Sequence, residues 1–397
     1  MLIKRLTLKK ILSFNDATVD LAQLNVLIGP NGVGKSNLLE IISLLQAAPT
    51  PNGLIGTILR GGGVRQWLWL GDGSSPPTSR IAAIECELSL RRGRRVGPLE
   101  YQLQFSEDAS GFVIVGEELS GPVSRPDRKA VTFFTRTSTG ERIARKPSGL
   151  SGTEVPTKLL SPTESLLAQH RTPGDPTPIT EVGNHLGEIQ IFREFRTGFG
   201  SGARSGSSTS VANESLDDAG ANLALVLQHL DFHGLHDRIR KHLHRFCERF
   251  EDVKVDIRQG LAQLFLQEAG LAEKLSSQRM SDGTLKFLAL LAVLFQPKPP
   301  PLVCLEEPEL GLHPDAVLMV ADILIEASES MQLIVTTHSE ALVDALTDRP
   351  ETVLVCDRDF DHGTKITRLE KKRLRAWLEH YSLGELWRKG EIGGGRW

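Results

Sequence analysis

The sequence predicts an α/β fold with a mostly parallel core sheet, an antiparallel β lobe and a helical insertion. A short aliphatic segment, 24–28, runs into a glycine-rich loop and then into a segment whose apolar residues recur at helical spacing. Further aliphatic segments at 302–305, 333–335 and 353–355 have the continuous apolar character of buried parallel strands. Between these two parts, the stretch from about 81 to 135 has the pattern of β-hairpins.

The bulk composition is that of an ordinary folded protein. The 397 residues suffice for one large domain with an insertion or for two to three smaller units. The net charge of -3 gives no overall bias toward nucleic acid, so any DNA or RNA contact is expected at local basic clusters. The four cysteines lack disulfide or zinc spacing, and no segment has the ~20 apolar residues that cross a bilayer. We therefore expect reduced thiols, no membrane contact and a cytoplasmic location.

The elements of the first half follow from alternation and punctuation. Residues 2–8 alternate as a strand, and the segment after Ser36 is predicted to be a helix that ends at Pro49 and Pro51. Two stretches rich in Pro, Gly and Ser, 137–184 and 196–210, are expected to be mobile loops. The strands of the β lobe are expected at 81–90, 99–105, 112–115 and 131–134.

The second half returns to regular patterns. A helix is expected around Leu223–Leu230, and an apolar stripe from Leu235 to Phe250 predicts a second helix. A strand follows at 253–257, and the apolar segment 285–295 indicates a buried helix. A helix at about 315–329 is expected to connect two of the parallel strands.

The glycine-rich loop has the pattern G-x-x-x-x-G-K-[ST]. Such a loop lets backbone N–H groups surround phosphate oxygens, and the following helix directs its positive end at them. We expect Lys35 to hold the β and γ phosphates and Ser36 to bind Mg²⁺. The sequence therefore predicts a P-loop NTPase that binds ATP and Mg²⁺ through Gly29, Pro30, Asn31, Gly32, Val33, Gly34, Lys35 and Ser36.

An acidic pair follows the aliphatic strand 302–305. Phosphoryl transfer requires carboxylate oxygens beside the metal and the attacking water. We predict that Glu306 belongs to the Mg²⁺ shell, through water, and that Glu307 orients the lytic water; the pair would then converge with Lys35 on one triphosphate. The alternative is that the two acids end a strand before a turn.

His338 follows the strand 333–335, within the segment Thr336-Thr337-His338-Ser339. The carboxyl ends of parallel strands collect ligands in open α/β sheets. We therefore expect His338 to contact the γ-phosphate or the attacking water, whereas a structural or exposed histidine is the alternative.

Four motifs occur in a family's order: GPNGVGKS, then Ser281-Asp282-Gly283-Thr284, then LVCLEEPELGLHP, then TTHS. Together they resemble the ABC-type ATPases of the RecF, SMC and OLD group, especially the compact stand-alone members. The resemblance covers 1–48 and 217–397 well. It implies an ABC-type ATPase head that sandwiches ATP in a head-to-tail homodimer. The expected divisions are an N-terminal head part at 1–135, a flexible insertion at 136–212, a helical and signature subdomain at 213–280 and a C-terminal head part at 281–397.

Ser281 and Gly283 are, by this resemblance, the signature donors that contact the nucleotide of the partner head. A hydroxyl and a backbone N–H at a helix amino terminus are also good anion ligands by themselves. Asp282 departs from the family pattern, because many ABC proteins have glycine there. Without the resemblance, the segment would be an ordinary turn and helix cap.

Other residues have less specific roles. The resemblance makes His313 a dimer contact, and a turn histidine is the alternative; Gln66 and Gln190 are the candidates for a Mg²⁺-sensing glutamine. Three basic clusters are candidates for nucleic-acid contact or solvated faces. They are Arg91, Arg92, Arg94 and Arg95; Arg238, Arg240, Lys241 and Arg245; and Lys371, Lys372, Arg373 and Arg375.

The function expected is an ATP-hydrolysing switch that controls an effector protein or nucleic acid, in a DNA-repair or phage-defence type of role. An OLD-like nuclease is an alternative, but little chain follows His338, and Asp357, Asp359 and Asp361 have the pattern of a hairpin. A regulatory subunit that binds ATP without hydrolysing it is another, and the pair Glu306 and Glu307 disfavours it.

Overall fold

The computed structural model describes residues 2–71, 80–90, 98–109, 111–121, 131–137, 140–143, 154–155, 161–170, 178–359 and 363–394. The chain forms two compact units. Unit 1 comprises Met1–Ile189, Pro350–Ala376 and Leu386–Trp397, and unit 2 comprises Gln190–Arg349 and Trp377–Glu385. Each unit therefore combines segments that are distant in the sequence.

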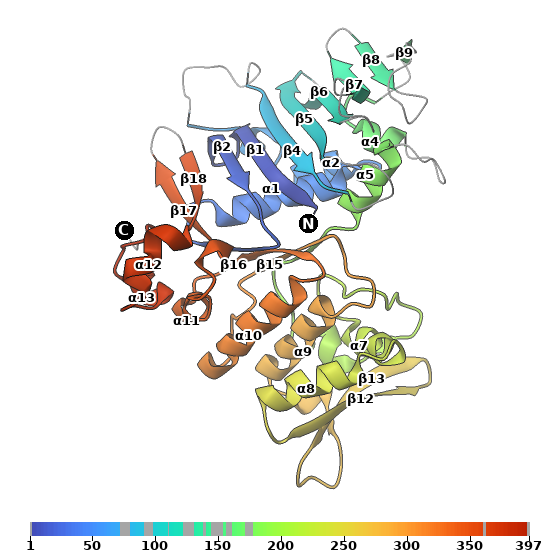
Figure 1. Ribbon diagram of the computed structural model, residues 1–397. Coiled ribbons are helices and arrows are strands. Elements are labelled where there is room, and N and C mark those ends of the chain that lie inside the picture. Colours follow the sequence, from blue (N-terminus) through green and yellow to red (C-terminus); the bar gives the residue numbers. More distant parts are fainter. Residues whose placement is uncertain are drawn as a thin grey trace. The chain divides into compact units, whose positions relative to one another are not determined.

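Unit 1 is built on one sheet with the strand order β3-β17-β18-β2-β1-β4-β5-β6-β7-β8-β9 (Figure 1). β3 and β17 are parallel, with Val26 opposite Val353, and β1, β2 and β4 to β9 form an antiparallel lobe. The strands are β1 (Ile3–Ile11), β2 (Phe14–Asp20), β3 (Leu24–Ile28), β4 (Ala82–Leu88), β5 (Leu99–Asp108), β6 (Gly111–Gly121), β7 (Val131–Thr137), β8 (Gly140–Ile143), β9 (Glu154–Val155), β17 (Val353–Asp359) and β18 (Gly363–Arg368).

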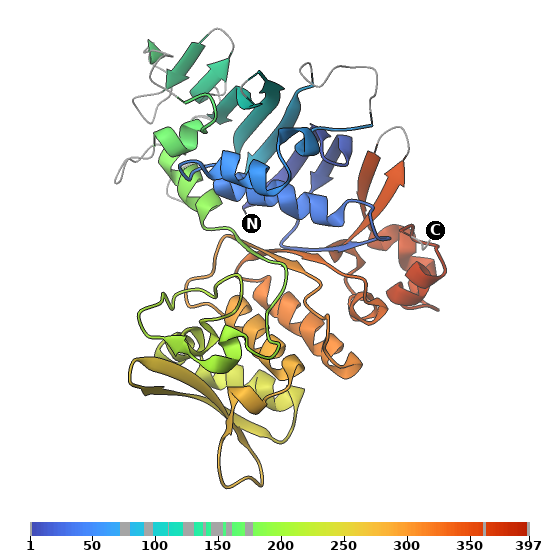
Figure 2. The ribbon, with the colours of Figure 1, turned by 180° about the vertical axis from the view of Figure 1, so that it is seen from behind.

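The helices of unit 1 cover one face of this sheet, where Figure 2 shows α1 in front of the strands. The leucines and isoleucines of α1 are buried, and all five residues of β3 are buried as well, as expected for a strand covered on both faces. The helices are α1 (Lys35–Ala47), α2 (Gly53–Arg60), α3 (Val64–Trp67), α4 (Leu166–Gln169) and α5 (Pro178–Gly187).

The range 136–212, expected to be a flexible insertion, contains regular structure where it is described. Residues 138–139, 144–153, 156–160 and 171–177 lie outside the described residues. A buried carboxylate, that of Glu117, orders the start of α4: it accepts hydrogen bonds from Ser165 Oγ at 2.5 Å and from the Leu166 N–H at 2.8 Å. Composition did not reveal this anchor, because Glu117 belongs to β6.

Unit 2 contributes three parallel strands in the order β10-β15-β16, in which Cys304 pairs with Ile191 on one side and Ile334 on the other. The strands are β10 (Gln190–Phe192), β15 (Leu302–Glu306) and β16 (Gln332–Thr336), and α10 (Pro314–Ala327) connects the last two. The buried helix α9 (Asp282–Leu294) packs against α10 and α7 (Leu223–Phe232).

A second sheet of unit 2 contains β11 (Ser207–Ser208), β12 (Phe250–Arg258), β13 (Leu261–Glu268) and β14 (Leu275–Ser276). The expected helix through Phe250 is shorter than predicted: α8 (His236–Phe246) ends when Cys247 becomes extended, and Phe250 begins β12. α6 (Gly202–Ser205) and η3 (Ser277–Arg279) also belong to this unit.

The remaining described helices are short: α11 (Glu340–Asp344), η4 (Pro350–Thr352), α12 (Lys371–Leu378) and α13 (Leu383–Arg388). Within the described ranges, no helix has both the length and the apolar character required to cross a membrane. The predicted α/β class, with parallel core strands and an antiparallel lobe, is confirmed.

Candidate functional site

The predicted phosphate loop connects β3 to α1 in unit 1 and has the conformation that glycine permits. Gly29 and Gly34 have φ values of 147° and 110°. A Cβ atom at Gly29 would collide with the carbonyl oxygen of Cys356 on β17. At Gly34 it would collide with the hydroxyls of Thr364 and Ser13. The backbone therefore approaches its neighbours closely, and its N–H groups are not shielded by side chains at these positions.

Two hydroxyl residues that sequence reasoning missed support this loop. The buried Thr364 on β18 donates to the Val33 carbonyl oxygen at 2.5 Å, and its hydroxyl lies 2.7 Å from Ser13 Oγ. Thr364 and Ser13 are separated by 351 positions, so no local pattern could have indicated the contact. β18 thereby holds the middle of the loop in place.

Lys35 is the first residue of α1 and is only 6% exposed. Its Nζ donates to the carbonyl oxygens of Gly29 at 2.8 Å and Pro30 at 3.0 Å, so the ammonium lies over the loop. The first turn of α1 has no acidic residue, which leaves the positive helix end uncompensated beside Ser36. A buried ammonium beside a helix amino terminus is an arrangement that favours anions.

The acidic pair lies at the carboxyl end of β15 in unit 2. Glu306 is paired with Thr336, so the polar ends of β15 and β16 share one edge of the sheet. Glu307 has a φ of 46°, a strained value for a residue with a side chain, and its N–H donates to the Thr336 carbonyl oxygen at 2.9 Å. That bond holds the turn at which the Glu307 side chain leaves the strand.

His338 lies beside this carboxylate, as its position after β16 predicted. Its Nε2 is 3.8 Å from Glu307 Oε1, and both side chains are about one-third exposed. The structure thus brings the two residues predicted to act on the attacking water into one cluster.

Glu309 forms a buried contact that the sequence did not reveal. Glu309 is 8% exposed, and its carboxyl accepts a hydrogen bond from the Thr337 hydroxyl, which in turn accepts from the Ser339 N–H at 2.9 Å. Burial raises the pKa of Glu309, and the nearby Glu307 carboxylate adds to the effect. The loop after the acidic pair is thereby joined to the loop that carries His338.

The signature segment precedes and begins α9 in unit 2. Ser281 is the N-cap and accepts from the Thr284 N–H at 3.0 Å, and the helix begins at Asp282 instead of near Thr284. Lys286 Nζ donates to the Leu310 carbonyl oxygen at 3.1 Å. The start of α9, with Gly283, therefore lies next to the loop that follows the acidic pair.

The remaining candidates have structural partners. His313 caps α10 by accepting from the Asp315 N–H at 3.3 Å. Gln190, at the start of β10, is hydrogen-bonded to Gln296 at 2.7 Å, and Gln66 is an exposed residue of α3. Neither observation identifies a Mg²⁺ sensor.

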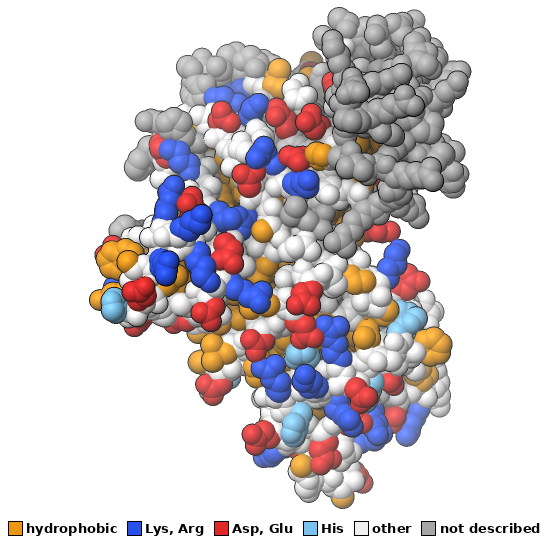
Figure 3. Space-filling view, viewed as in Figure 1, with side chains coloured by type: hydrophobic (Ala, Val, Ile, Leu, Met, Phe, Trp, Pro, Cys, Tyr) orange, Lys and Arg blue, Asp and Glu red, His pale blue; other side chains and the backbone are white. Residues whose placement is uncertain are grey.

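On the face that Figure 3 shows, Lys and Arg side chains lie among Asp and Glu side chains. Arg238 is bonded to Glu326 at 2.9 Å, and Arg245 to Asp322 at 2.7 Å, so part of the second cluster joins α8 to α10. The third cluster lies on α12, which has no buried residue. The first cluster, Arg91, Arg92, Arg94 and Arg95, and also Asp361, lie outside the described residues.

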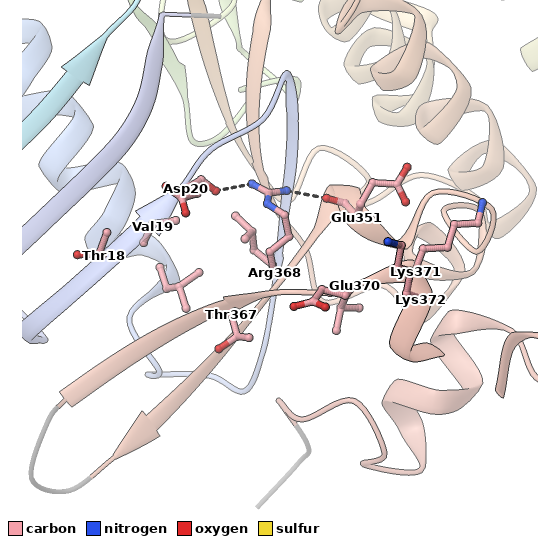
Figure 4. Close-up of a pocket in the computed structure, with 12 residues that line it drawn as sticks. Thr18, Val19, Asp20, Glu351, Thr367, Arg368, Glu370, Lys371 and Lys372 are labelled. Atoms are coloured by element: carbon pink, nitrogen blue, oxygen red, sulfur yellow. Dashed lines mark hydrogen bonds between the residues drawn. The ribbon is translucent and has the colours of Figure 1, made fainter. Parts of the chain in front are cut away.

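A cleft of about 580 Å³ in unit 1 is lined by Lys371 and Lys372 of the third basic cluster, and by none of the residues predicted to bind ATP or Mg²⁺. It forms because β2 and β18 are paired at Phe14 and Gly363 and then diverge. Figure 4 shows Arg368 across the cleft, where its guanidinium donates to the carbonyl oxygens of Asp20 and Glu351, each at 2.7 Å. Arg368 thus bridges the diverging strands.

The family described as "AAA domain, putative AbiEii toxin, Type IV TA system" matches residues 24–79 and 153–344, more than half of the chain. These ranges include every residue predicted to contact ATP, Mg²⁺ or the attacking water, and they leave out most of the β lobe. No curated protein sequence matches the chain.

Two solved structures have a similar fold. The SmcHead bound to the C-winged helix domain of ScpA has 16% identity and a TM-score of 0.54, over 94% of this chain and 99% of that chain. The Smc head domain with an extended coiled coil, bound to the C-terminal domain of ScpA derived from Pyrococcus furiosus, has 14% identity and a TM-score of 0.54, over 95% and 98%. This chain has the ABC-type ATPase fold of those heads, and it belongs to the AAA-domain family whose profile it matches.

Proposed function

We propose that this protein binds ATP with Mg²⁺ and hydrolyses it to ADP and phosphate. The observation that carries the proposal is the clustering of Glu306, Glu307 and His338 at one sheet edge of unit 2, in a chain whose unit 1 holds Lys35 in a glycine loop. Positioning and electrostatic stabilisation are the main requirements of phosphoryl transfer, and these residue types supply both.

Each residue has a defined task in this proposal. The backbone N–H groups of the loop and Lys35 hold the β and γ phosphates, and Glu307 orients the attacking water. His338, 3.8 Å from Glu307, contacts the same water or the γ-phosphate. Ser36 and Glu306 offer the hard oxygen ligands that Mg²⁺ prefers, and the bound ion would neutralise charge on the phosphates.

We further propose that ATP joins two copies head to tail, with Ser281 and Gly283 of one copy contacting the nucleotide of the other. Exposed apolar side chains near this segment support the choice of a second copy as occupant. Phe199 is fully exposed, and Leu310 is 61% exposed beside Lys286. Burial of such side chains would favour association.

We also propose that the protein controls an effector protein, DNA or RNA. Its role would be in DNA repair or phage defence within the cytoplasm. The similar Smc heads were solved bound to ScpA domains, which makes a protein partner the first candidate. The exposed basic residues of α12 are the candidates for nucleic-acid contact.

Substitution of Glu307 tests hydrolysis. Glu307→Gln is expected to bind ATP as the wild type does while releasing phosphate at least ~100-fold more slowly, because a positioned base contributes about that much. It should accumulate as an ATP-dependent dimer in size-exclusion chromatography with light scattering. Lys35→Ala is the control and should lose nucleotide binding.

Two results would contradict the proposal. Equal phosphate release by the wild type and Glu307→Gln would leave an ATP-binding regulatory subunit as the better description. A monomer at saturating ATP would exclude the head-to-tail switch.

A further inference from the structure

Arg204 makes an unusually dense set of contacts in unit 2. It lies on α6, and its side chain is 12% exposed. Its Nε donates to the Thr197 carbonyl oxygen at 2.6 Å, and its Nη1 to the Met280 carbonyl oxygen at 2.7 Å. Nη1 also lies 3.2 Å from the carbonyl oxygens of Ser277 and Gln278, and Ser277 Oγ donates back to the Arg204 carbonyl oxygen at 2.8 Å.

The same guanidinium forms an ion pair with the signature segment itself. Arg204 Nη2 is 2.5 Å from Asp282 Oδ1. Asp282 stands between Ser281 and Gly283, at the position where the family pattern has glycine. The residue that departs from the family pattern, Asp282, therefore has a specific partner, because its carboxylate is paired with Arg204.

Arginine has the geometry that this arrangement requires. Its planar group offers five N–H donors in a fixed fork, whereas lysine offers one rotating ammonium. The acceptors come from two segments: Thr197 belongs to the loop that contains Phe199, whereas Met280 precedes α9 and Asp282 begins it. That loop and the start of α9 are walls of a cleft of about 680 Å³.

We propose that Arg204 is a positioning residue that fixes Ser281 and Gly283 in the conformation that contacts a nucleotide held by a second copy. The inference rests on the proposed head-to-tail dimer. Arg204 touches no nucleotide in this role. It acts by clamping the backbone immediately before α9 and by holding Asp282 away from incoming phosphate oxygens.

The test compares Arg204→Gln and Arg204→Lys in the Glu307→Gln background. Binding of a fluorescent ATP analogue by the monomer should not change, since Lys35 and its loop belong to unit 1. ATP-dependent dimerisation, followed by light scattering against protein concentration, should weaken about tenfold or more for Arg204→Gln, because charge-assisted hydrogen bonds are lost. The weakening of dimerisation in Arg204→Lys should be smaller than in Arg204→Gln but still measurable against Glu307→Gln alone. Arg249→Gln is the matched control, because Arg249 pairs with Glu268 at 3.4 Å on the exposed surface of the same unit.

A second measurement keeps the inference separate from the proposed function. Amide hydrogen exchange in the monomer should accelerate at 277–283 in Arg204→Gln and stay unchanged in α1. Unchanged exchange there, or dimerisation equal to that of Glu307→Gln alone, would overturn the role of Arg204. Loss of nucleotide binding by Arg204→Gln would also overturn it, as a sign of general misfolding. Failure of Glu307→Gln itself to dimerise would instead contradict the head-to-tail dimer.

Discussion

At the scale of single residues, side chains that lie close to the backbone of the phosphate loop determine which of its glycines can be replaced. Gly34 combines a φ of 110° with hydroxyl neighbours on β18 and in the turn between β1 and β2, whereas Gly32 has a φ of 74° and open space at its Cβ position. The sequence motif requires glycine at position 34 and leaves position 32 unspecified, and the structure likewise constrains only Gly34 by close neighbours. The difference can be measured.

Gly34→Ala should destabilise unit 1 and abolish ATP binding. The added Cβ collides with Thr364 and Ser13 and also has an unfavourable φ, which together cost about 2–3 kcal/mol. Gly32→Ala meets no atom within 4 Å and should cost about 1 kcal/mol for its φ alone. Chemical denaturation with nucleotide titration compares them. Equal losses in the two variants would show that the contacts with Thr364 and Ser13 are unimportant.

The buried acid Glu309 should make the stability of the protein depend on pH. Burial raises the pKa of Glu309, so the folded state favours the protonated carboxyl. The contribution of Glu309 to the free energy of unfolding is therefore present at low pH and is lost as pH rises from the ordinary carboxyl range through the raised pKa. Glu309→Gln keeps an acceptor for Thr337 without the charge. The variant should therefore have a higher melting temperature than the wild type at pH 7, and the gain should shrink at pH 4.5. A gain that does not vary with pH would contradict the role of burial.

At the scale of elements, α8 and α10 are joined by a partly charged contact. His242 on α8 is buried, stacks on Phe295 with ring centroids 5.0 Å apart, and places Nε2 at 3.1 Å from a Glu326 carboxylate oxygen of α10. Its Nδ1 has no hydrogen-bond partner within the described residues. Arg238 and Arg245 also face this contact from α8.

Acidification should loosen this helix pair. Burial lowers the pKa of His242, opposed by Glu326 and assisted by Arg245 and Arg238. The unfolded chain therefore takes up the proton more readily, so the stability that His242 provides is present above its ordinary pKa of ~6.5 and is lost as pH falls below it. Melting temperatures of wild type and His242→Gln between pH 7.5 and 5.5 test this. A wild-type curve parallel to that of the variant would exclude His242 as the cause.

At the scale of the whole molecule, the predicted site residues are divided between two units. Unit 1 contributes Lys35 and its loop, and unit 2 contributes Glu306, Glu307, His338 and the signature segment. Each unit also combines distant segments of the chain. In unit 1, β17 and β18 belong to the same sheet as β1 to β9, although most of unit 2 lies between them in the sequence. The chain order alone does not show this division.

Mg-ATP should raise the melting temperature of the wild type in a concentration-dependent way. Ligand at 100 times its Kd adds ~2.7 kcal/mol to the free energy of unfolding. Differential scanning fluorimetry across a nucleotide series gives the shift, with Lys35→Ala as the control that should not respond. A wild-type protein that also fails to respond would contradict ATP binding.

Much of the fold followed from local patterns, and the misses have physical causes. The strands β3, β15, β16 and β17 were predicted because each is continuously aliphatic. β10 was missed because three residues are too few to show a periodic pattern. α4 was missed because its start is ordered by Glu117, and α5 because it depends on packing against α1. β13 was missed although Ala262, Leu264 and Leu266 alternate as its buried face.

The sequence by itself determined the phosphate-loop motif, the acidic pair, His338 and the α/β class, because glycine spacing, strand hydrophobicity and strand-end polar residues are all local properties. The tertiary structure alone decided which residues support them: Thr364 on Gly34, Thr337 on Glu309 and Arg204 on Asp282. These partners are separated by tens to hundreds of positions. Only folding brings such groups within hydrogen-bonding distance, since the interaction extends over about 3 Å and leaves no periodic trace in the chain.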